Sequence, residues 1–142
     1  MSNLAQLQQW LIKNKIDAFI LIRTDEFLSE FIAPYAERLN WISNFSGSAG
    51  KAIIMQTTAY IFVDGRYTVQ VQEEVNMHNF KILPVKDFHK CLETNLKKNN
   101  LVGIDPNHHA KKDIESIKKI TNKIDVKMKF LESNPIDLLW KN

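Results

Sequence analysis

The sequence predicts one α/β domain built on a mixed sheet flanked by helices. The run Ala18–Ile22 is continuously apolar, which is typical of a strand covered on both faces. It follows a segment with helical spacing, and strand and helix patterns alternate again after residue 63. The length of 142 residues, 44% of them hydrophobic, suits a single domain with a real core, which we place at residues 1–142.

In the first half of the chain, Ser2 is placed to cap a helix. The apolar residues of this helix recur at helical spacing and are Leu4, Leu7 and Leu11. Residues 24–40 are expected to form a connection with a short helical piece broken at Pro34. Two strands are expected to pair as an antiparallel hairpin, and these are Lys51–Met55 and Ala59–Val63.

In the second half, strands are expected at 80–85, 101–104 and 128–131. Three helices, each with a stripe of apolar residues along one face, are also expected in this half. Their stripe residues are Tyr67, Val71 and Val75, then Phe88, Leu92 and Leu96, and finally Ile114, Ile117, Ile120 and Ile124. Asp87 is placed to cap the second of these helices, and a last helical turn is expected at 135–140, where Pro135 can start it.

Composition narrows the class of protein. A net charge of +3 is too small to favour nucleic acid as a partner, and the lysine-rich stretch 111–129 is interpreted as a solvated face. The N-terminus lacks the pattern of a signal peptide, and no apolar run is long enough to span a bilayer. The single cysteine, Cys91, cannot form an internal disulfide. We therefore expect a cytoplasmic protein with no membrane and no nucleic-acid partner.

Histidine and cysteine give no sign of a metal or nucleophile site. The adjacent His108 and His109 point apart on a helix and lack further ligands at metal-binding spacing. All four histidines, with His78 and His89, are interpreted as surface or loop residues. Cys91 lies beside the apolar face of its helix and is expected to be a buried, inert thiol.

Residues 46–50, Ser-Gly-Ser-Ala-Gly, superficially resemble a phosphate-binding loop. A phosphate loop leads into a helix N-terminus, whereas this one leads into an expected strand. We interpret it as a tight turn in which Gly47, Ala49 and Gly50 allow two backbone segments to approach closely.

A strand-to-helix corner at Asp64-Gly65-Arg66-Tyr67 is the most informative local feature. Asp64 can cap the next helix, and Gly65 can adopt a positive φ. Arg66 and Tyr67 then either complete a structural corner or reach a ligand or partner, and both interpretations stay open. A second polar group contains Ser29, Glu30 and Arg38, in which Glu30 is able to pair with Arg38.

Five segments occur in a specific order: DEFLSEFIAP (25–34), RLNWISNFSGSAG (38–50), AYIFVDGRY (59–67), GIDP (103–106) and NPIDLLW (134–140). Together they resemble the N-terminal domain of Xaa-Pro aminopeptidases, the aminopeptidase P group of the creatinase/prolidase superfamily. The resemblance covers nearly the whole chain. It implies the creatinase N-terminal fold, with its ribonuclease H-like motif. The chain departs from the family pattern at Phe27 and Phe31, where many relatives have histidine and tyrosine, which puts any role of that histidine in doubt.

The resemblance also implies a function. The parent enzyme would remove an N-terminal residue that precedes proline, using two divalent metal ions, commonly manganese, in a separate C-terminal pita-bread domain absent from this chain. This chain would then hold no catalytic residue and no metal. It would help to form a homodimer and limit access to peptides with proline second, through Ser29, Glu30, Arg38, Asp64, Arg66 and Tyr67 at domain interfaces or the substrate entrance. The alternative is a free-standing, non-catalytic domain that binds a protein or peptide.

Overall fold

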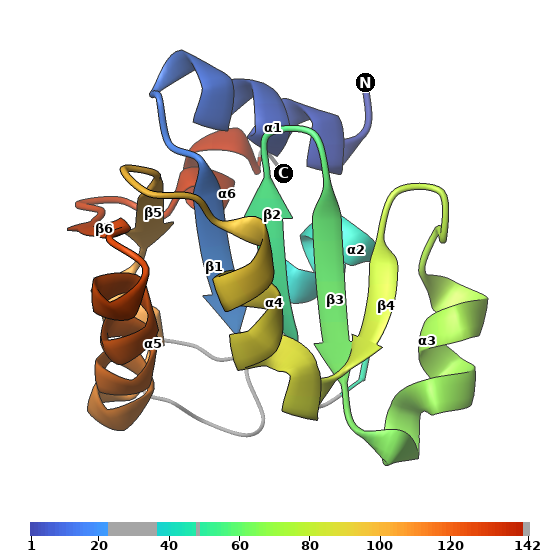
Figure 1. Ribbon diagram of the computed structural model, residues 1–142. Coiled ribbons are helices and arrows are strands. Elements are labelled where there is room, and N and C mark those ends of the chain that lie inside the picture. The colour runs from blue at the N-terminus through green and yellow to red at the C-terminus, as the bar shows by residue number, and fades with distance from the viewer. Residues whose placement is uncertain (23–36, 48, 141–142) are drawn as a thin grey trace.

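A computed structural model describes residues 1–22, 37–47 and 49–140 of the chain (Figure 1). The described residues form one six-stranded sheet in the order β4-β3-β2-β1-β5-β6. Its strands are β1 (Ala18–Ile22), β2 (Lys51–Met55), β3 (Ala59–Val63), β4 (Lys81–Pro84), β5 (Leu101–Ile104) and β6 (Lys127–Phe130). β2 runs antiparallel to β1 and β3, whereas the other neighbouring pairs are parallel. The predicted mixed sheet is therefore confirmed.

Helices cover both faces of this sheet. The helices in the described residues are α1 (Asn3–Lys13), α2 (Arg38–Ser43), α3 (Thr68–Glu74), α4 (Phe88–Asn95), α5 (Lys111–Lys123) and α6 (Pro135–Leu139). In Figure 1, α4 lies in front of the sheet and α2 behind it. Within the described ranges, three short 3-10 turns join strands to helices, at Gly65–Tyr67, Val85–Asp87 and Pro106–His108.

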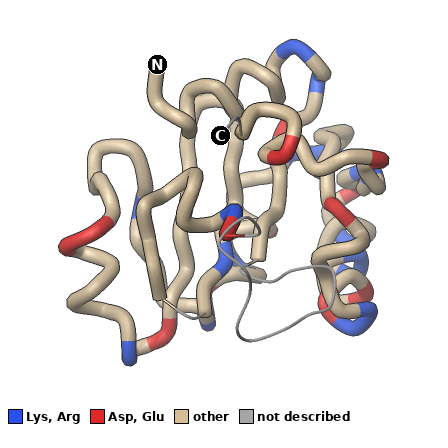
Figure 2. Tube along the Cα trace, turned by 180° about the vertical axis from the view of Figure 1, so that it is seen from behind, with Lys and Arg blue, Asp and Glu red and all other residues tan. Residues whose placement is uncertain are grey.

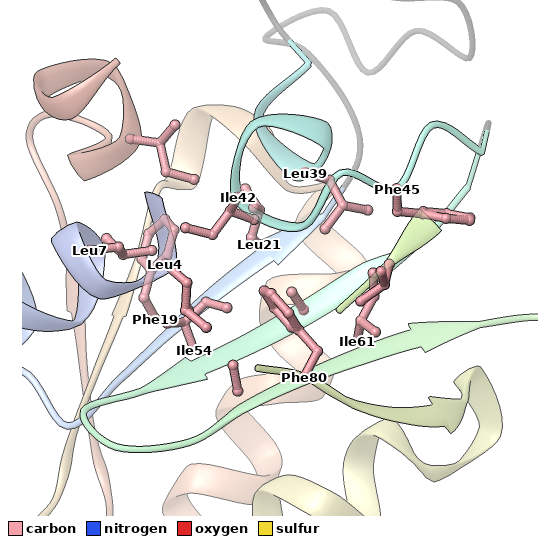
Figure 3. Packing of buried hydrophobic residues seen from close by; sticks show 14 of the residues in the cluster. Leu4, Leu7, Phe19, Leu21, Leu39, Ile42, Phe45, Ile54, Ile61 and Phe80 are labelled. Carbon is pink, nitrogen blue, oxygen red and sulfur yellow. The ribbon is translucent and has the colours of Figure 1, made fainter. Parts of the chain in front are cut away.

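The alternation of side chains along each strand divides the core into two clusters. On β1, Phe19 and Leu21 face α1 and α2, while Ala18 and Ile20 face α4 and α5. Figure 3 shows the first cluster, with Leu4 and Leu7 of α1 lying over the sheet. The fully buried Phe19, Leu7 and Ile20 each contribute about 2 kcal/mol by leaving water, so both faces of the sheet stabilise the fold.

The predicted side-chain caps at the starts of α1 and α4 have different outcomes. The hydroxyl of Ser2 accepts a hydrogen bond from the backbone N–H of Ala5 at 3.1 Å, as a cap should. Asp87 occupies the N-cap of α4 but makes no side-chain capping bond, so that prediction is wrong. Asp87 already belongs to the preceding 3-10 turn, and its φ and ψ of −91° and 4° are not the extended values that a capping side chain needs. The predicted break at Pro34 lies outside the described residues.

Charges are spread over the surface. Figure 2 shows basic and acidic positions interspersed along α5, the helix that carries the lysine-rich stretch. Lys118 and Lys119 of α5 are exposed, while Ile117 of the same helix is buried. The lysines therefore lie on a solvated face, as predicted.

Candidate functional site

The corner after β3 presents an exposed ion pair. Asp64 Oδ1 accepts the backbone N–H of Arg66 at 2.9 Å, and the guanidinium Nη2 of Arg66 donates to Oδ2 at 2.9 Å. The hydrogen bonds from Arg66 lower the pKa of Asp64, so its carboxylate stays charged at neutral pH. The Arg66 side chain is 69% exposed, and an exposed pair contributes little to folding. The corner therefore displays an exposed guanidinium beside a carboxylate that also caps the following turn.

The aromatic ring of Tyr67 connects this corner to the glycine turn. It packs edge-on against Phe45, with ring centroids 5.6 Å apart. The Phe45 ring in turn lies under Gly47, where an added Cβ would come within 2.2 Å of Cζ. Arg66 also places its guanidinium carbon 5.2 Å from the centre of the Tyr67 ring. The tertiary structure therefore brings the two sequence motifs into one unit.

A polar network fixes the same turn to α3. The backbone N–H and hydroxyl of Ser46 donate to the two carboxylate oxygens of Glu74, at 2.9 and 2.7 Å. Gln70 donates from Nε2 to the Ser46 hydroxyl at 3.0 Å. The hydrogen bonds from Ser46 lower the pKa of Glu74, so the network holds a charged carboxylate. In the part of the chain that the structure describes, hydrogen bonds to a carboxylate, and not an ion pair, join the turn to α3.

The glycines of the two motifs differ in their constraints. At Gly50, an added Cβ would lie 2.9 Å from Leu39 Cδ2, and Gly47 is crowded by Phe45, so small residues allow close packing at both positions. Gly65 has no positive φ and no atom within 4 Å of an added Cβ, which makes the predicted positive φ wrong. The residue starts a 3-10 turn, whose backbone lies in the right-handed region open to any residue.

A hollow of about 170 Å³ lies between turn and corner. Its lining includes Ala49 and Gly50 of the turn, and Val63 and Asp64 at the end of β3. Lys51 also borders it, with its ammonium group 4.8 Å from the centre of the Phe88 ring. The hollow is mostly apolar with one carboxylate and one ammonium at its edge, an arrangement suited to holding a side chain or peptide segment.

Arg38 belongs to a different contact. Its Nε and Nη2 donate to Oδ1 and Oδ2 of Asp137 on α6, at 2.8 and 2.9 Å. The Arg38 side chain is only 8% exposed, and among the described residues its Nη1 is buried with no hydrogen-bond partner. Ser29 and Glu30 lie outside the described residues, so the predicted pairing of Glu30 with Arg38 stays a prediction.

A buried polar cluster was missed by the sequence reasoning. Nδ1 of His108 lies 2.5 Å from Oδ2 of Asp105, and Nδ2 of Asn134 donates to the same oxygen at 3.1 Å. Burial alone would raise the pKa of Asp105, but the hydrogen bonds from His108 and from the backbone of Asn107 outweigh it and lower the pKa. The sequence does carry one sign of these two residues, because Asp105 and Asn134 each precede a proline. In the structure Asp105 caps the 3-10 turn that follows it and Asn134 caps α6.

The prediction that the four histidines are surface or loop residues holds only in part, because His108 and His109 lie in or next to the turn after β5 but are not at the surface. Both are 7% exposed, whereas His78 and His89 are exposed as predicted. Burial lowers the pKa of His109 to about 4, against a hydrogen bond to the backbone of Ile20 that favours the charged ring. The reason for the error is that the turn after β5 folds back onto the sheet. Cys91 is buried as predicted, and burial raises the pKa of its thiol.

The described residues contain no group of three or more His, Cys, Asp or Glu side chains that could hold a metal ion. The two metal ions that the resemblance assigns to a separate domain therefore have no candidate ligand group in the described part of this chain. Within the same residues, every helix is too short or too polar to cross a bilayer.

Comparisons with known proteins agree on one family. The profile of the Creatinase/Prolidase N-terminal domain matches residues 3–131. A relative from Laccaria bicolor, named "Probable Xaa-Pro aminopeptidase P", is 34% identical over 143 residues, which cover 96% of this chain and 22% of the relative. One of the same name from Paracoccidioides lutzii is 31% identical over 142 residues, covering 96% and 23%. The chain thus spans less than a quarter of the length of these relatives.

Solved structures share the fold. The X-prolyl aminopeptidase from Caenorhabditis elegans, described as a cytosolic enzyme with a di-nuclear active site, superimposes with a TM-score of 0.88 at 24% identity, over 97% of this chain and 25% of that one. The N-terminal domain of the cytoplasmic peptidase PepQ from Mycobacterium tuberculosis H37Rv gives 0.73 at 14% identity, over 97% and 98%. At these identities the likeness concerns the fold. Because the profile spans most of the chain and the curated relatives match it almost throughout, the chain belongs to the Creatinase/Prolidase N-terminal domain family.

Proposed function

We propose that this chain is the non-catalytic N-terminal domain of a cytoplasmic, metal-dependent Xaa-Pro aminopeptidase, which removes an N-terminal residue that precedes proline. The observation that carries the proposal is the length relation. Relatives of that name match 96% of this chain, while the chain accounts for 22% of the Laccaria protein. The hydrolytic site, with two divalent ions that we propose to be manganese, then belongs to the remainder of the longer protein.

Within that enzyme, the domain contributes to subunit assembly as a homodimer and to substrate access. The corner after β3 supports this role because it combines exposed charge with a fixed backbone. Arg66 is exposed, yet the Asp64 cap and the packing of Tyr67 on Phe45 hold its position. A pre-positioned guanidinium can bind a carboxylate of a partner domain or peptide at small cost in conformational entropy. Ser29 and Glu30 belong to the same proposal.

The activity is tested by comparing this 142-residue chain with the complete product of its gene. Both are incubated with manganese and a peptide whose second residue is proline, and release of the first residue is measured. Cleavage by the complete product and none by the 142-residue chain is the expected result. Turnover by the 142-residue chain alone would contradict a non-catalytic domain. A complete product without a catalytic portion would support the alternative, a free-standing domain that binds a protein or peptide.

The role of the corner is tested by Arg66→Ala. In the complete enzyme, kcat/KM or the fraction of dimer is expected to fall, because the substitution removes an exposed charge held at a fixed position. The melting temperature of the 142-residue chain should barely change. Lys118→Ala, at another exposed basic residue, serves as the matched control and should affect neither measurement. A large fall in melting temperature together with normal activity would show that the corner is only structural.

A further inference from the structure

A groove of about 430 Å³ lies between the end of α1, the edge strand β6 and the helix α6. Its apolar lining includes Trp10, Phe130 and Leu138. Phe130 is 54% exposed and Leu138 is 55% exposed, although both are large apolar side chains. Polar groups of Asn14 and Glu132 also line it. Exposed apolar side chains around a hollow with polar groups beside them are typical of an interaction surface.

Tertiary contacts hold the short helix α6 against the rest of the domain. A helix of five residues is not stable in isolation, and terminal segments usually fray. Here Ile136 is fully buried, Asn134 donates to the buried Asp105, and Asp137 accepts two hydrogen bonds from Arg38. These contacts fix the orientation of α6, and with it the place of Leu138 beside the groove.

Aromatic packing continues this anchoring to the last described residue. The ring of Trp140 lies 6.3 Å from that of Trp41 on α2, measured between centroids. Trp41 is itself held by its backbone carbonyl, which accepts a hydrogen bond from the side chain of Asn3 on α1 at 2.8 Å. Trp140, directly after α6, is therefore held in place through α2 and α1.

We propose that this groove seats the portion of the longer protein that follows α6, so that α6 acts as a rigid connector between domains. The inference rests on the proposed function, in which the chain is one domain of a protein more than four times its length. A following domain is tethered beside the groove, and such a tether gives an effective concentration in the millimolar range. A modest patch is then enough for stable docking. Its occupant presents an apolar side chain to Phe130 and Leu138, and hydrogen-bonding groups to the polar edge.

Hydrogen exchange tests the docking directly. In the complete gene product, the amides of residues 127–140 are expected to exchange at least tenfold more slowly than in the 142-residue chain. The double substitution Phe130→Asp with Leu138→Asp should abolish that difference. The matched control is Val69→Asp with Met77→Asp, at apolar side chains that are 68% and 64% exposed and do not line the groove. The control should keep the slow exchange.

The outcomes separate docking from stability and from function. If the double substitution also unfolds the 142-residue chain, the milder Leu138→Ser replaces it, and loss of at least half of the protection is then expected. Equal exchange of residues 127–140 in the two proteins overturns the docking inference, even if the complete product cleaves Xaa-Pro peptides. Slow exchange without peptide cleavage supports the docking and overturns the proposed function.

Discussion

The wild-type protein is expected to lose stability as the pH falls from 6.5 to about 4, and replacing His109 with glutamine should remove that loss. His109 is 7% exposed and borders a cavity of about 50 Å³ that is lined by residues of β1, α4 and α5. Burial lowers the pKa of its ring from 6.5 to about 4, although the carboxylates of Asp105 and Asp113 favour the charged form and His108 opposes it. Glutamine keeps a donor for the backbone of Ile20 but does not titrate.

The sign and size follow from proton linkage. In the unfolded chain the imidazole binds a proton near pH 6.5, whereas in the folded protein it does so only near pH 4. The unfolded state therefore binds more protons between these values, and stability falls as the pH is lowered. One pKa unit corresponds to about 1.4 kcal/mol, so the loss is about 2 kcal/mol at pH 5 and about 3 kcal/mol at pH 4.

The assay is denaturant unfolding of the wild type and His109→Gln at half-unit steps from pH 4 to pH 7.5. The difference in free energy of unfolding between the two proteins removes the contribution of groups that both share. Asp105, with a lowered pKa, contributes stability that is lost only below its ordinary value of 3.8, outside this window. His78→Gln, at an exposed histidine, is the matched control for replacing a histidine with glutamine.

Two results would refute this reasoning. The first is a difference between His109→Gln and the wild type that stays constant from pH 7.5 to pH 4. The second is an NMR titration of the wild type that shows the ring of His109 protonating near pH 6.5. Either would mean that water reaches the ring and that burial does not disfavour its charged form.

Three further predictions concern a crowded glycine, a buried ion pair and a buried thiol. Gly47→Ala is expected to lower the free energy of unfolding by about 2 kcal/mol, because the new Cβ would meet the buried ring of Phe45. Gly65→Ala, where an added Cβ meets no atom, should change it by less than about 1 kcal/mol. Equal effects of the two substitutions in denaturant unfolding would contradict this prediction. Arg38→Met should lower the free energy of unfolding by about 2 kcal/mol, because it breaks a largely buried ion pair. The loss is limited to this size because the carboxylate of Asp137 is half exposed and water can solvate it again. Lys123→Met, at an exposed ion pair, should lower the same free energy by less than about 0.5 kcal/mol. The thiol of Cys91 should react with a disulfide reagent at least a hundredfold more slowly in the folded than in the unfolded protein, and comparable rates would show that it is accessible.

Elements with a strong local signal could be predicted from the sequence. The helix after Ser2, the strand Ala18–Ile22 and the hairpin of β2 and β3 follow from apolar spacing, a cap residue and a short turn, all of which act within a few residues. The ordered motifs also indicated the family, because their residue types and order are specific. The cap at Asp87 failed because a 3-10 turn, not an extended residue, precedes α4.

Chain composition and local periodicity by themselves determined that this protein has a mixed sheet covered by helices and a polar strand-to-helix corner after residue 63. Only the tertiary structure decided which partners the polar residues have. Arg38 pairs with Asp137, 99 residues away, and Asn134 reaches Asp105 across 29 residues. Burial of His109 likewise depends on how the turn after β5 folds back on the sheet. Such contacts depend on the packing of whole helices against the sheet, and no pattern within a short window of sequence specifies that packing.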